Sequence, residues 1–215
     1  MNFRQFRRFE KNEYILVGAD TSMGMSDYCT AQFLSRNKLD VPLVFHAKVL
    51  ANDMTAELLP VIEKIFDQTG VRPTIAYERN NGGVFELERL AGLNRANKFD
   101  VFKMPNRGNI ENSDPTKLGW DTNTATRPRM LSDLKDAIDK KLITIYDKPT
   151  IDEMYSFIIT HTTSTEKAQA ERGAHDDLLF ALAIAFQLYQ LLPNRTIPSF
   201  QPMPVFTPSD SVIGI

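Results

Sequence analysis

Apolar residues in the first half of the chain form short runs typical of strands and, once, a spacing typical of a helix. Runs rich in β-branched and aromatic residues, separated by short polar turns, predict three successive strands at 14–19, 28–34 and 41–50. From Asp53 to Phe66 the apolar residues recur at helical spacing, with Asn52 or Asp53 placed to cap the helix and Gly70 to end it. The chain therefore begins with a three-stranded meander and a helix.

The middle of the chain continues this alternation. A short apolar run predicts a strand at 74–77, the residues after an Asn-Asn-Gly-Gly turn predict a helix at 84–96, and a further strand follows at 100–104. The predicted order to this point is βββαβαβ. Such an order indicates an α/β domain with a central mixed sheet of about five strands flanked by helices.

The second half is less regular. Residues 105–129 change to Asn, Asp, Thr, Gly and Pro and predict a long loop. A helix is expected at 128–140, and strands at 142–146 and 155–159 are expected to form an auxiliary β-hairpin. After a polar segment at 160–173, residues 177–192 predict a helix that is apolar nearly all round and is therefore buried against the sheet.

Length and composition favour one domain without disulfides. The 215 residues, 42% of them hydrophobic, are enough for one core, which we place at 1–192, with 193–215 as a proline-containing extended tail. Cys29 is the only cysteine, so an intrachain disulfide is impossible and a reducing compartment is expected. The N-terminus lacks the apolar run of a secretory signal, and the most apolar stretch is shorter than the ~20 residues that span a bilayer. We therefore expect a soluble protein.

Carboxylates stand at the edges of three apolar segments that are far apart in the sequence. Asp20 ends the run YILVGAD, Glu78 ends TIAYE, and Asp176 with Asp177 opens the last apolar helix. A hard divalent cation such as Mg²⁺ takes oxygen ligands, so carboxylates brought together from separate segments can form a two-metal phosphodiester site. Asp27, at the end of the turn DTSMGMSD, is placed to reach the same ions.

Each of these residues also has a structural explanation when it is taken alone. Asp20 can end a strand and cap a turn, and Glu78 can form an ion pair with a neighbour, worth under ~1 kcal/mol at the surface. Asp176 or Asp177 stands where a helix N-cap belongs, and a cap stabilises a helix by ~1 kcal/mol. The metal interpretation therefore depends on the three segments meeting at one place.

Four blocks of sequence, in order, resemble the nuclease domain of the large terminase subunit of tailed bacteriophages. They are GADTSMGMSDY, YERNNGGVFELERL, GWDTNTATRPRMLSDL and GAHDDLLFALAIAF. The resemblance covers roughly residues 12–192 and implies an RNase H-like fold with carboxylates on the first strand of the meander, on the fourth strand and at a late helix. The phosphate-binding sequence GxxxxGK[ST] of the terminase ATPase motor does not occur in these 215 residues.

This resemblance implies a metal-dependent endonuclease that cuts concatemeric viral DNA during genome packaging, in the host cell cytoplasm. Two ions, Mg²⁺ or Mn²⁺, would be bridged by Asp20, with Glu78 on one ion and Asp177 on the other. Asp176 is an alternate or second ligand, and Asp27 is a further candidate. The implied partners are double-stranded DNA, the terminase ATPase domain, the small terminase subunit and the portal protein, with no membrane.

The net charge of −2 requires that contacts with DNA phosphates be local. Basic residues gather near the N-terminus and are scattered again through residues 95–129. Candidates for phosphate contacts are Arg107, Lys117, Arg127, Arg129 and His175. His175 can instead donate a hydrogen bond next to the metal ligands or be purely structural. Charges of this kind equally fit a solvated surface.

Two other functions stay open at this point. A Holliday-junction resolvase or a transposase of the same fold would use a similar carboxylate set, and would differ by cutting junctions symmetrically or by joining strands. A catalytically silent module that binds DNA or the portal protein belongs to a different class. Such a module would show no Mn²⁺-dependent nicking and no stabilisation by Mn²⁺.

Overall fold

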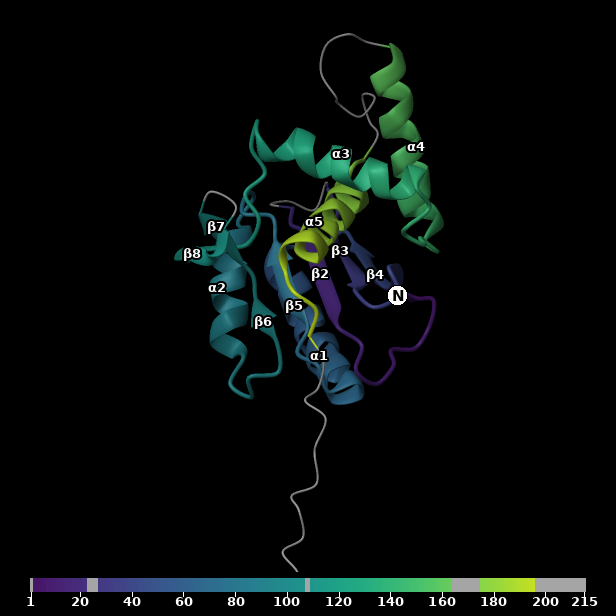
Figure 1. Cartoon of the computed structure of the whole chain (residues 1–215). Coiled ribbons are helices and arrows are strands. Elements are labelled where there is room, and N and C mark those ends of the chain that lie inside the picture. Colours follow the sequence, from purple (N-terminus) through teal and green to yellow (C-terminus); the bar gives the residue numbers. More distant parts are fainter. Residues whose placement is uncertain (1, 23–26, 107–108, 164–174, 196–215) are drawn as a thin grey trace, which may run out of the picture.

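The computed structural model describes residues 2–22, 27–106, 109–163 and 175–195 (Figure 1). Its elements are β1 (Phe3–Gln5), β2 (Ile15–Asp20), β3 (Cys29–Ser35), β4 (Asp40–Ala47), α1 (Ala51–Thr69), β5 (Thr74–Tyr77), α2 (Gly83–Leu93), β6 (Asp100–Val101), β7 (Lys103–Asn106), β8 (Asn109–Leu118), α3 (Thr126–Asp139), α4 (Lys148–Thr163) and α5 (Asp177–Leu191). In this described part, β1 to β6 form one sheet and β7 pairs with β8 in a second.

The central sheet has the strand order β1-β4-β3-β2-β5-β6. Strands β2, β3 and β4 form the predicted antiparallel meander, and β5 then runs parallel to β2. β1 extends one edge beside β4, and β6 extends the other edge parallel to β5. The predicted α/β class with a mixed central sheet is confirmed, and the sheet has six strands because the short β1 also joins it.

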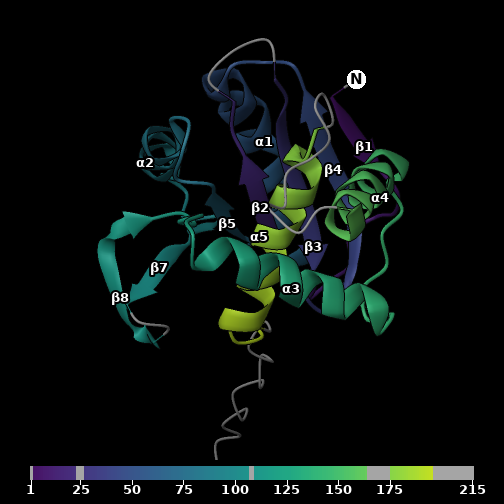
Figure 2. The same cartoon turned by 90° about the horizontal axis from the view of Figure 1, so that it is seen from above.

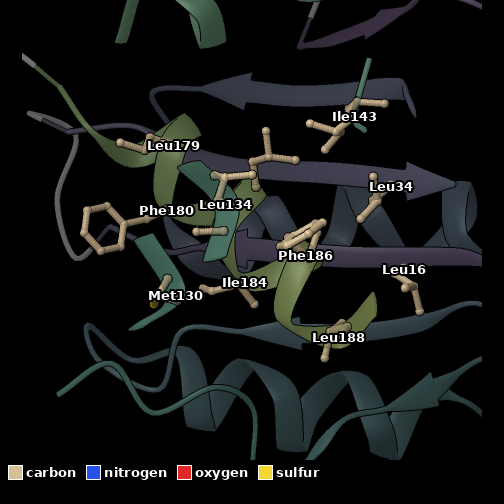
Figure 3. Close-up of a cluster of buried hydrophobic side chains, with 14 of the residues drawn as sticks. Leu16, Leu34, Met130, Leu134, Ile143, Leu179, Phe180, Ile184, Phe186 and Leu188 are labelled. Carbon is tan, nitrogen blue, oxygen red and sulfur yellow. The ribbon is translucent and has the colours of Figure 1, made fainter. Parts of the chain in front are cut away.

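Helices cover both faces of the central sheet (Figures 1 and 2). α5 lies across the middle of one face with α3 and α4 beside it, and α1 and α2 lie on the opposite side. There is one hydrophobic core on each face of the sheet, and successive side chains of β2 contribute to them in turn. Leu16 belongs to the core on the α5 side, whereas Ile15 and Val17 belong to the core on the α1 side. Figure 3 shows the first core, where Ile184 of α5 and Leu34 of β3 belong to the same cluster.

Helix α5 is buried along most of its length, as its composition predicts. Side chains from Leu178 to Leu188 are at most 5% exposed. The helix approaches β2 closely at Gly18, where a Cβ atom would lie 2.1 Å from the carbonyl oxygen of Ala181 and 2.4 Å from the amide nitrogen of Ala185. A side chain at Gly18 would therefore meet backbone atoms. Among the residues described, no helix combines the length and apolar character needed to cross a membrane.

Helix α1 begins earlier and ends later than its apolar pattern predicts. Its N-cap position is Leu50, and no side chain caps it. The prediction that Asn52 or Asp53 caps the helix is therefore wrong, because both residues lie inside the first turn. The prediction for the other end is confirmed, since Gly70 closes the helix in the left-handed conformation with a φ of 75°.

The prediction of a long loop at 105–129 is wrong. This range contains part of β7, all of β8 and the start of α3. β7 and β8 pair antiparallel with irregular register. Backbone hydrogen bonds can hold such a pair without the alternation of apolar residues by which a strand is recognised in a sequence. The single strand predicted at 100–104 is divided between β6 and β7.

The β-hairpin predicted at 142–159 is also wrong. Thr144 forms an isolated bridge to Asp40, and residues 155–159 lie within α4. Their aromatic and β-branched composition indicated a strand, but Met154 and Phe157 are buried at helical spacing. The auxiliary hairpin of the fold is formed by β7 and β8 instead.

The C-terminal boundary stays a prediction. The polar segment expected at 160–173 falls partly in α4 and otherwise outside the described residues, as does most of the tail at 193–215. The helix predicted at 177–192 is confirmed as α5.

Arginines near the N-terminus are tied into the fold. Arg4 donates from Nε and Nη2 to the two carboxylate oxygens of Asp147, at 2.5 and 2.9 Å. Arg7 pairs with the carboxylates of Glu13 and Asp40. Burial alone would raise the pKa of both carboxyls, but the hydrogen bonds from Arg7 bring each pKa below its ordinary value. These two arginines therefore hold the N-terminal strand and its neighbours together.

Candidate metal centre

Asp20 and Glu78 lie next to each other at the ends of two parallel strands. β2 ends at Asp20, and β5 ends at Tyr77, the residue before Glu78. Ala19 pairs with Tyr77, and the Glu78 amide donates to the Ala19 carbonyl at 2.7 Å, which continues the ladder by one residue. Parallel strands present their carboxyl ends at one edge of a sheet, so the first two predicted segments meet there.

Burial and repulsion act together on the Asp20 carboxyl. Its pKa lies well above the ordinary value, first because the group is buried and then because the negative charge of Glu78 stands beside it. The charges of Asp177 and Asp176 act in the same direction. The three predicted segments therefore form one electrostatic cluster.

Asp177 forms a second group with Asp27 and His175 at the start of α5. One ligand atom from each residue lies within 4.8 Å of the other two, which is close enough to share a cation. His175 Nδ1 is 3.3 Å from Asp27 Oδ1 and 3.6 Å from Asp177 Oδ2. Burial, followed by the charge of Asp27, raises the pKa of Asp177 to about 8. Asp177 Oδ2 is buried without a hydrogen-bond partner in the described part of the chain, as a metal-ligating oxygen would be.

Asp176 is held differently from its neighbour. It occupies the N-cap position of α5, yet its side chain makes no capping hydrogen bond, so the capping explanation does not apply to it. Its Oδ2 lies 3.6 Å from Nη2 of Arg127, whose guanidinium also stands 4.7 Å over the ring of Phe180. Burial raises the pKa of Asp176, although Arg127 lowers it. Asp176 therefore has a cationic partner from α3.

Glu153 also reaches this region and was not predicted from the sequence. Its Oε2 accepts a hydrogen bond from the amide of Leu179 at 3.1 Å. Burial raises the pKa of Glu153 to about 7, and the charge of Asp176 adds to the rise. The assignment of residues 155–159 to a strand concealed this role, because it placed Glu153 in a loop instead of on a helix beside α5.

The residues expected to contact phosphates are spread over several elements. Lys117 is exposed near the end of β8, and Arg129 is exposed on α3, 3.8 Å from Asp133. Arg127 and His175 lie beside the carboxylates of Asp176 and Asp27, and Arg107 lies outside the described residues. A DNA-binding role for these five candidates stays a prediction.

The residues brought together fit a hard divalent cation. They offer carboxylate oxygens and one imidazole nitrogen, a donor set that suits Mg²⁺, Mn²⁺ and other first-row ions. The pKa values of Asp20, Asp176 and Asp177 are all raised, because buried carboxyl groups stand close together. A cation among these carboxylates would relieve the repulsion, which supports metal binding at this edge of the sheet.

By sequence, the chain matches no protein-family model and no curated protein. Its fold does match solved structures. The large terminase nuclease from thermophilic phage G20c superimposes with a TM-score of 0.62 at 16% identity, over 88% of this chain and 89% of that one. The large terminase nuclease domain of Thermus phage P74-26 gives a TM-score of 0.61 at 15% identity, over 92% and 90%. This chain has the fold of a large terminase nuclease domain.

The terminase nuclease fold confirms the predicted RNase H-like class. The human cytomegalovirus terminase nuclease domain, soaked in manganese and bound to an inhibitor, also matches, with a TM-score of 0.51 at 12% identity over 85% of this chain and 89% of that one. The G20c nuclease has been solved with bound magnesium, zinc and cobalt. At such low identity these matches establish the terminase nuclease fold, and the chemistry has to be argued from the residues of this chain.

Proposed function

We propose that this protein is a metal-dependent DNA endonuclease that cuts concatemeric viral DNA during genome packaging. The observation that carries the proposal is the convergence of Asp20, Glu78 and Asp177 from β2, the end of β5 and the start of α5. The raised pKa values of Asp20 and Asp177 reflect this convergence. The terminase nuclease fold of the chain supports the same function.

Two divalent ions, Mg²⁺ or Mn²⁺, are the proposed cofactors. Asp20, Glu78 and Asp177 would hold these ions, with Asp20 as the carboxylate common to both, Glu78 serving one and Asp177 the other. Asp27 and His175 lie beside Asp177 and complete that side of the centre. When bound, such ions lower the pKa of water and offset charge on the entering and leaving oxygens of the phosphodiester. The task of the protein is to hold these side chains at fixed positions along the sheet edge.

Tyr28 fixes the exposed side of the proposed centre. Its ring lies 4.1 Å from the ring of His46 and edge-on to that of His175 at 5.2 Å. Lys48 Nζ lies 4.8 Å over the same Tyr28 ring. The ammonium group of Lys48 is thus held on the Tyr28 ring, next to His175, where its positive charge can attract a DNA phosphate despite the net negative charge of the chain.

Double-stranded DNA is proposed to lie across this edge of the sheet. In the described part of the chain the proposed phosphate contacts are Lys117 at the end of β8, Arg127 and Arg129 on α3, and His175 before α5. Contacts of this kind position DNA without reading its sequence, so cutting with little sequence preference is expected. The proposed partners are the terminase ATPase domain, the small terminase subunit and the portal protein, in the cytoplasm of the host cell.

Nicking of supercoiled plasmid DNA with Mn²⁺ tests the proposal. Asp20→Ala, Glu78→Ala and Asp177→Ala should each abolish nicking and leave the circular dichroism spectrum unchanged, because each variant removes one ligand from a preserved fold. Glu88→Gln changes an exposed carboxylate on α2 and is the matched control, which should cut normally.

Near-normal cutting by all three alanine variants would remove the nuclease assignment. DNA binding by the wild-type protein without Mn²⁺-dependent nicking would identify a binding module instead. Symmetric cutting of four-way junctions in preference to linear duplex would identify a resolvase.

A further inference from the structure

The first turn of α5 carries Asp177 but is not capped by the residues that precede it. The first amides of a helix have no partner within the helix and need one from elsewhere. Asp176 at the N-cap makes no such bond. Glu153 of α4 supplies it instead, since its Oε2 accepts from the Leu179 amide at 3.1 Å. The cap of α5 is therefore provided by a different helix.

The carbonyl groups of the same turn are held from the sheet. Thr30 of β3 donates from Oγ1 to the Asp177 carbonyl at 2.8 Å. Gln32 of β3 donates from Nε2 to the Leu178 carbonyl at 3.2 Å, and also to Thr150 Oγ1 at 2.8 Å. Thr30 and Gln32 are fully buried. β3 therefore holds the carbonyl groups of this turn, and Glu153 holds its amide side.

Helix α4, which presents Glu153, is itself anchored. Asp147 is 1% exposed and accepts from the backbone amide of Thr150 at 3.1 Å and from its hydroxyl at 2.7 Å. Arg4 of β1 binds the same carboxylate with two hydrogen bonds. α4 lies beside α5 in both views (Figures 1 and 2). Glu153 therefore projects from a helix whose start is fixed to β1, an edge strand of the central sheet.

We propose that Glu153 is a positioning residue for the metal centre, a role that rests on the function proposed above. By accepting the Leu179 amide, Glu153 leaves Asp176 and Asp177 free of the capping role that residues at a helix start usually take. Without Glu153, the exposed amides would draw in one of these two carboxylates as a side-chain cap. The metal centre would then lose a ligand, or hold it in a different direction.

The test compares Glu153→Ala, Glu153→Gln and the control Asp152→Ala. Glu153→Ala removes the acceptor, whereas the Glu153→Gln side chain keeps one carbonyl oxygen that can accept the Leu179 amide. Asp152 is exposed on the same helix and pairs with Lys148, so its loss leaves the contact with α5 in place.

Calorimetric titration with Mn²⁺ gives the first readout. Loss of a residue that orients metal ligands typically costs 10–100-fold in metal affinity, so the Kd of Glu153→Ala should rise by about that factor. Glu153→Gln and Asp152→Ala should stay within about threefold of the wild type, because both keep an acceptor for the Leu179 amide. A residue with a purely structural role would lower the melting temperature without metal and leave the Kd unchanged, and that result would overturn the proposal.

Hydrogen exchange without metal gives the second readout. The Leu179 amide should exchange faster in Glu153→Ala than in Glu153→Gln, because Asp176 is also held by Arg127 and would cap that amide only part of the time. Unchanged exchange in Glu153→Ala would also overturn the proposal. The two readouts separate this inference from the proposed function. If the wild-type protein bound no Mn²⁺, the metal centre would be refuted, and the exchange rates would still decide whether Glu153 holds the first turn of α5.

Discussion

Asp176 and Asp177 are adjacent in the chain, but their side chains have different surroundings. Asp176 pairs with Arg127, whereas Asp177 Oδ2 is buried beside Asp27 and His175. We expect Asp177→Asn to lose most of the stabilisation by Mn²⁺, which for the wild type is about 2.7 kcal/mol at a hundredfold excess over Kd. Asp176→Asn should keep most of it, because that carboxylate already has Arg127 as a cationic partner. Thermal unfolding with and without Mn²⁺ measures the stabilisation of each variant. If the two variants lost the same amount of stabilisation by Mn²⁺, the different roles assigned to Asp176 and Asp177 would be contradicted.

The raised pKa of Asp177 predicts a pH dependence of stability in the absence of metal. The folded state holds this proton up to about pH 8, whereas an unfolded aspartate releases it near pH ~4. The contribution of Asp177 to the stability of the folded state is therefore fully present below pH ~4 and is lost as the pH rises through about 8. Glu153, whose pKa burial raises to about 7, adds to the same trend. The metal-free melting temperature should fall between pH about 5 and 8.

Two controls belong to this pH experiment. Asp177→Asn should show a smaller fall, because the amide cannot ionise. Mn²⁺ should restore the melting temperature at the upper end of the range, since it binds the ionised carboxylates. The carboxyls with lowered pKa values, Glu13, Asp40 and Asp147, titrate below this window and have the opposite sign. A metal-free melting temperature that rises from pH 5 to 8 would contradict the expected repulsion.

At the scale of elements, the contact between α5 and β2 decides whether Asp177 reaches Asp20. Gly18→Ala places a Cβ atom within 2.4 Å of two α5 backbone atoms, neither of which can rotate away. We expect a loss of unfolding free energy of at least the ~1–3 kcal/mol typical of overpacked cores. The Kd for Mn²⁺ should rise as well, because α5 would be displaced from the strand that carries Asp20.

Gly92→Ala on α2 is the matched control for this prediction. A Cβ atom there meets nothing within 4 Å, so the substitution should stabilise the helix by roughly 0.5–1 kcal/mol. Urea denaturation measures both changes. Equal stabilities for Gly18→Ala and the wild type would show that α5 does not pack against β2 as closely as described.

At the scale of the whole molecule, charge limits how firmly DNA is held. The chain has a net charge of −2, and Arg4 and Arg7 are already paired with carboxylates. With about four phosphate contacts, affinity for DNA should fall on the order of a hundredfold between about 50 and 200 mM salt. Nicking assayed across a salt series should follow this decline. Tight binding that survives high salt would point to a contact surface other than the one proposed.

Nicking by this chain should also proceed without ATP. The reaction needs a divalent ion, water and a held phosphate, and these 215 residues contain no GxxxxGK[ST] sequence that would cradle a nucleotide. Parallel assays with and without ATP at fixed Mn²⁺ measure this. A requirement for ATP would contradict the proposed mechanism.

The sequence by itself determined the parts of the fold that follow from periodic patterning. Strands β2 to β5 and helices α1 and α5 are recognisable because alternating or helical spacing of apolar residues reflects the face that each element buries. The sequence also placed Asp20 and Glu78 at strand ends and Asp177 at a helix start. β8 and α4 were missed, because a strand held by backbone hydrogen bonds has no apolar signature and because the aromatic and β-branched residues of α4 resemble those of a strand.

Only the tertiary structure decided how the carboxylates differ from one another. Asp20 meets Glu78 because β2 and β5 are parallel neighbours, and Asp177 joins them because Gly18 lets α5 approach β2. The pairing of Asp176 with Arg127 and the capping of α5 by Glu153 join residues that are distant in the chain. Local sequence encodes which face an element buries, whereas charge, burial and hydrogen bonding at a site depend on which elements become neighbours when the chain folds.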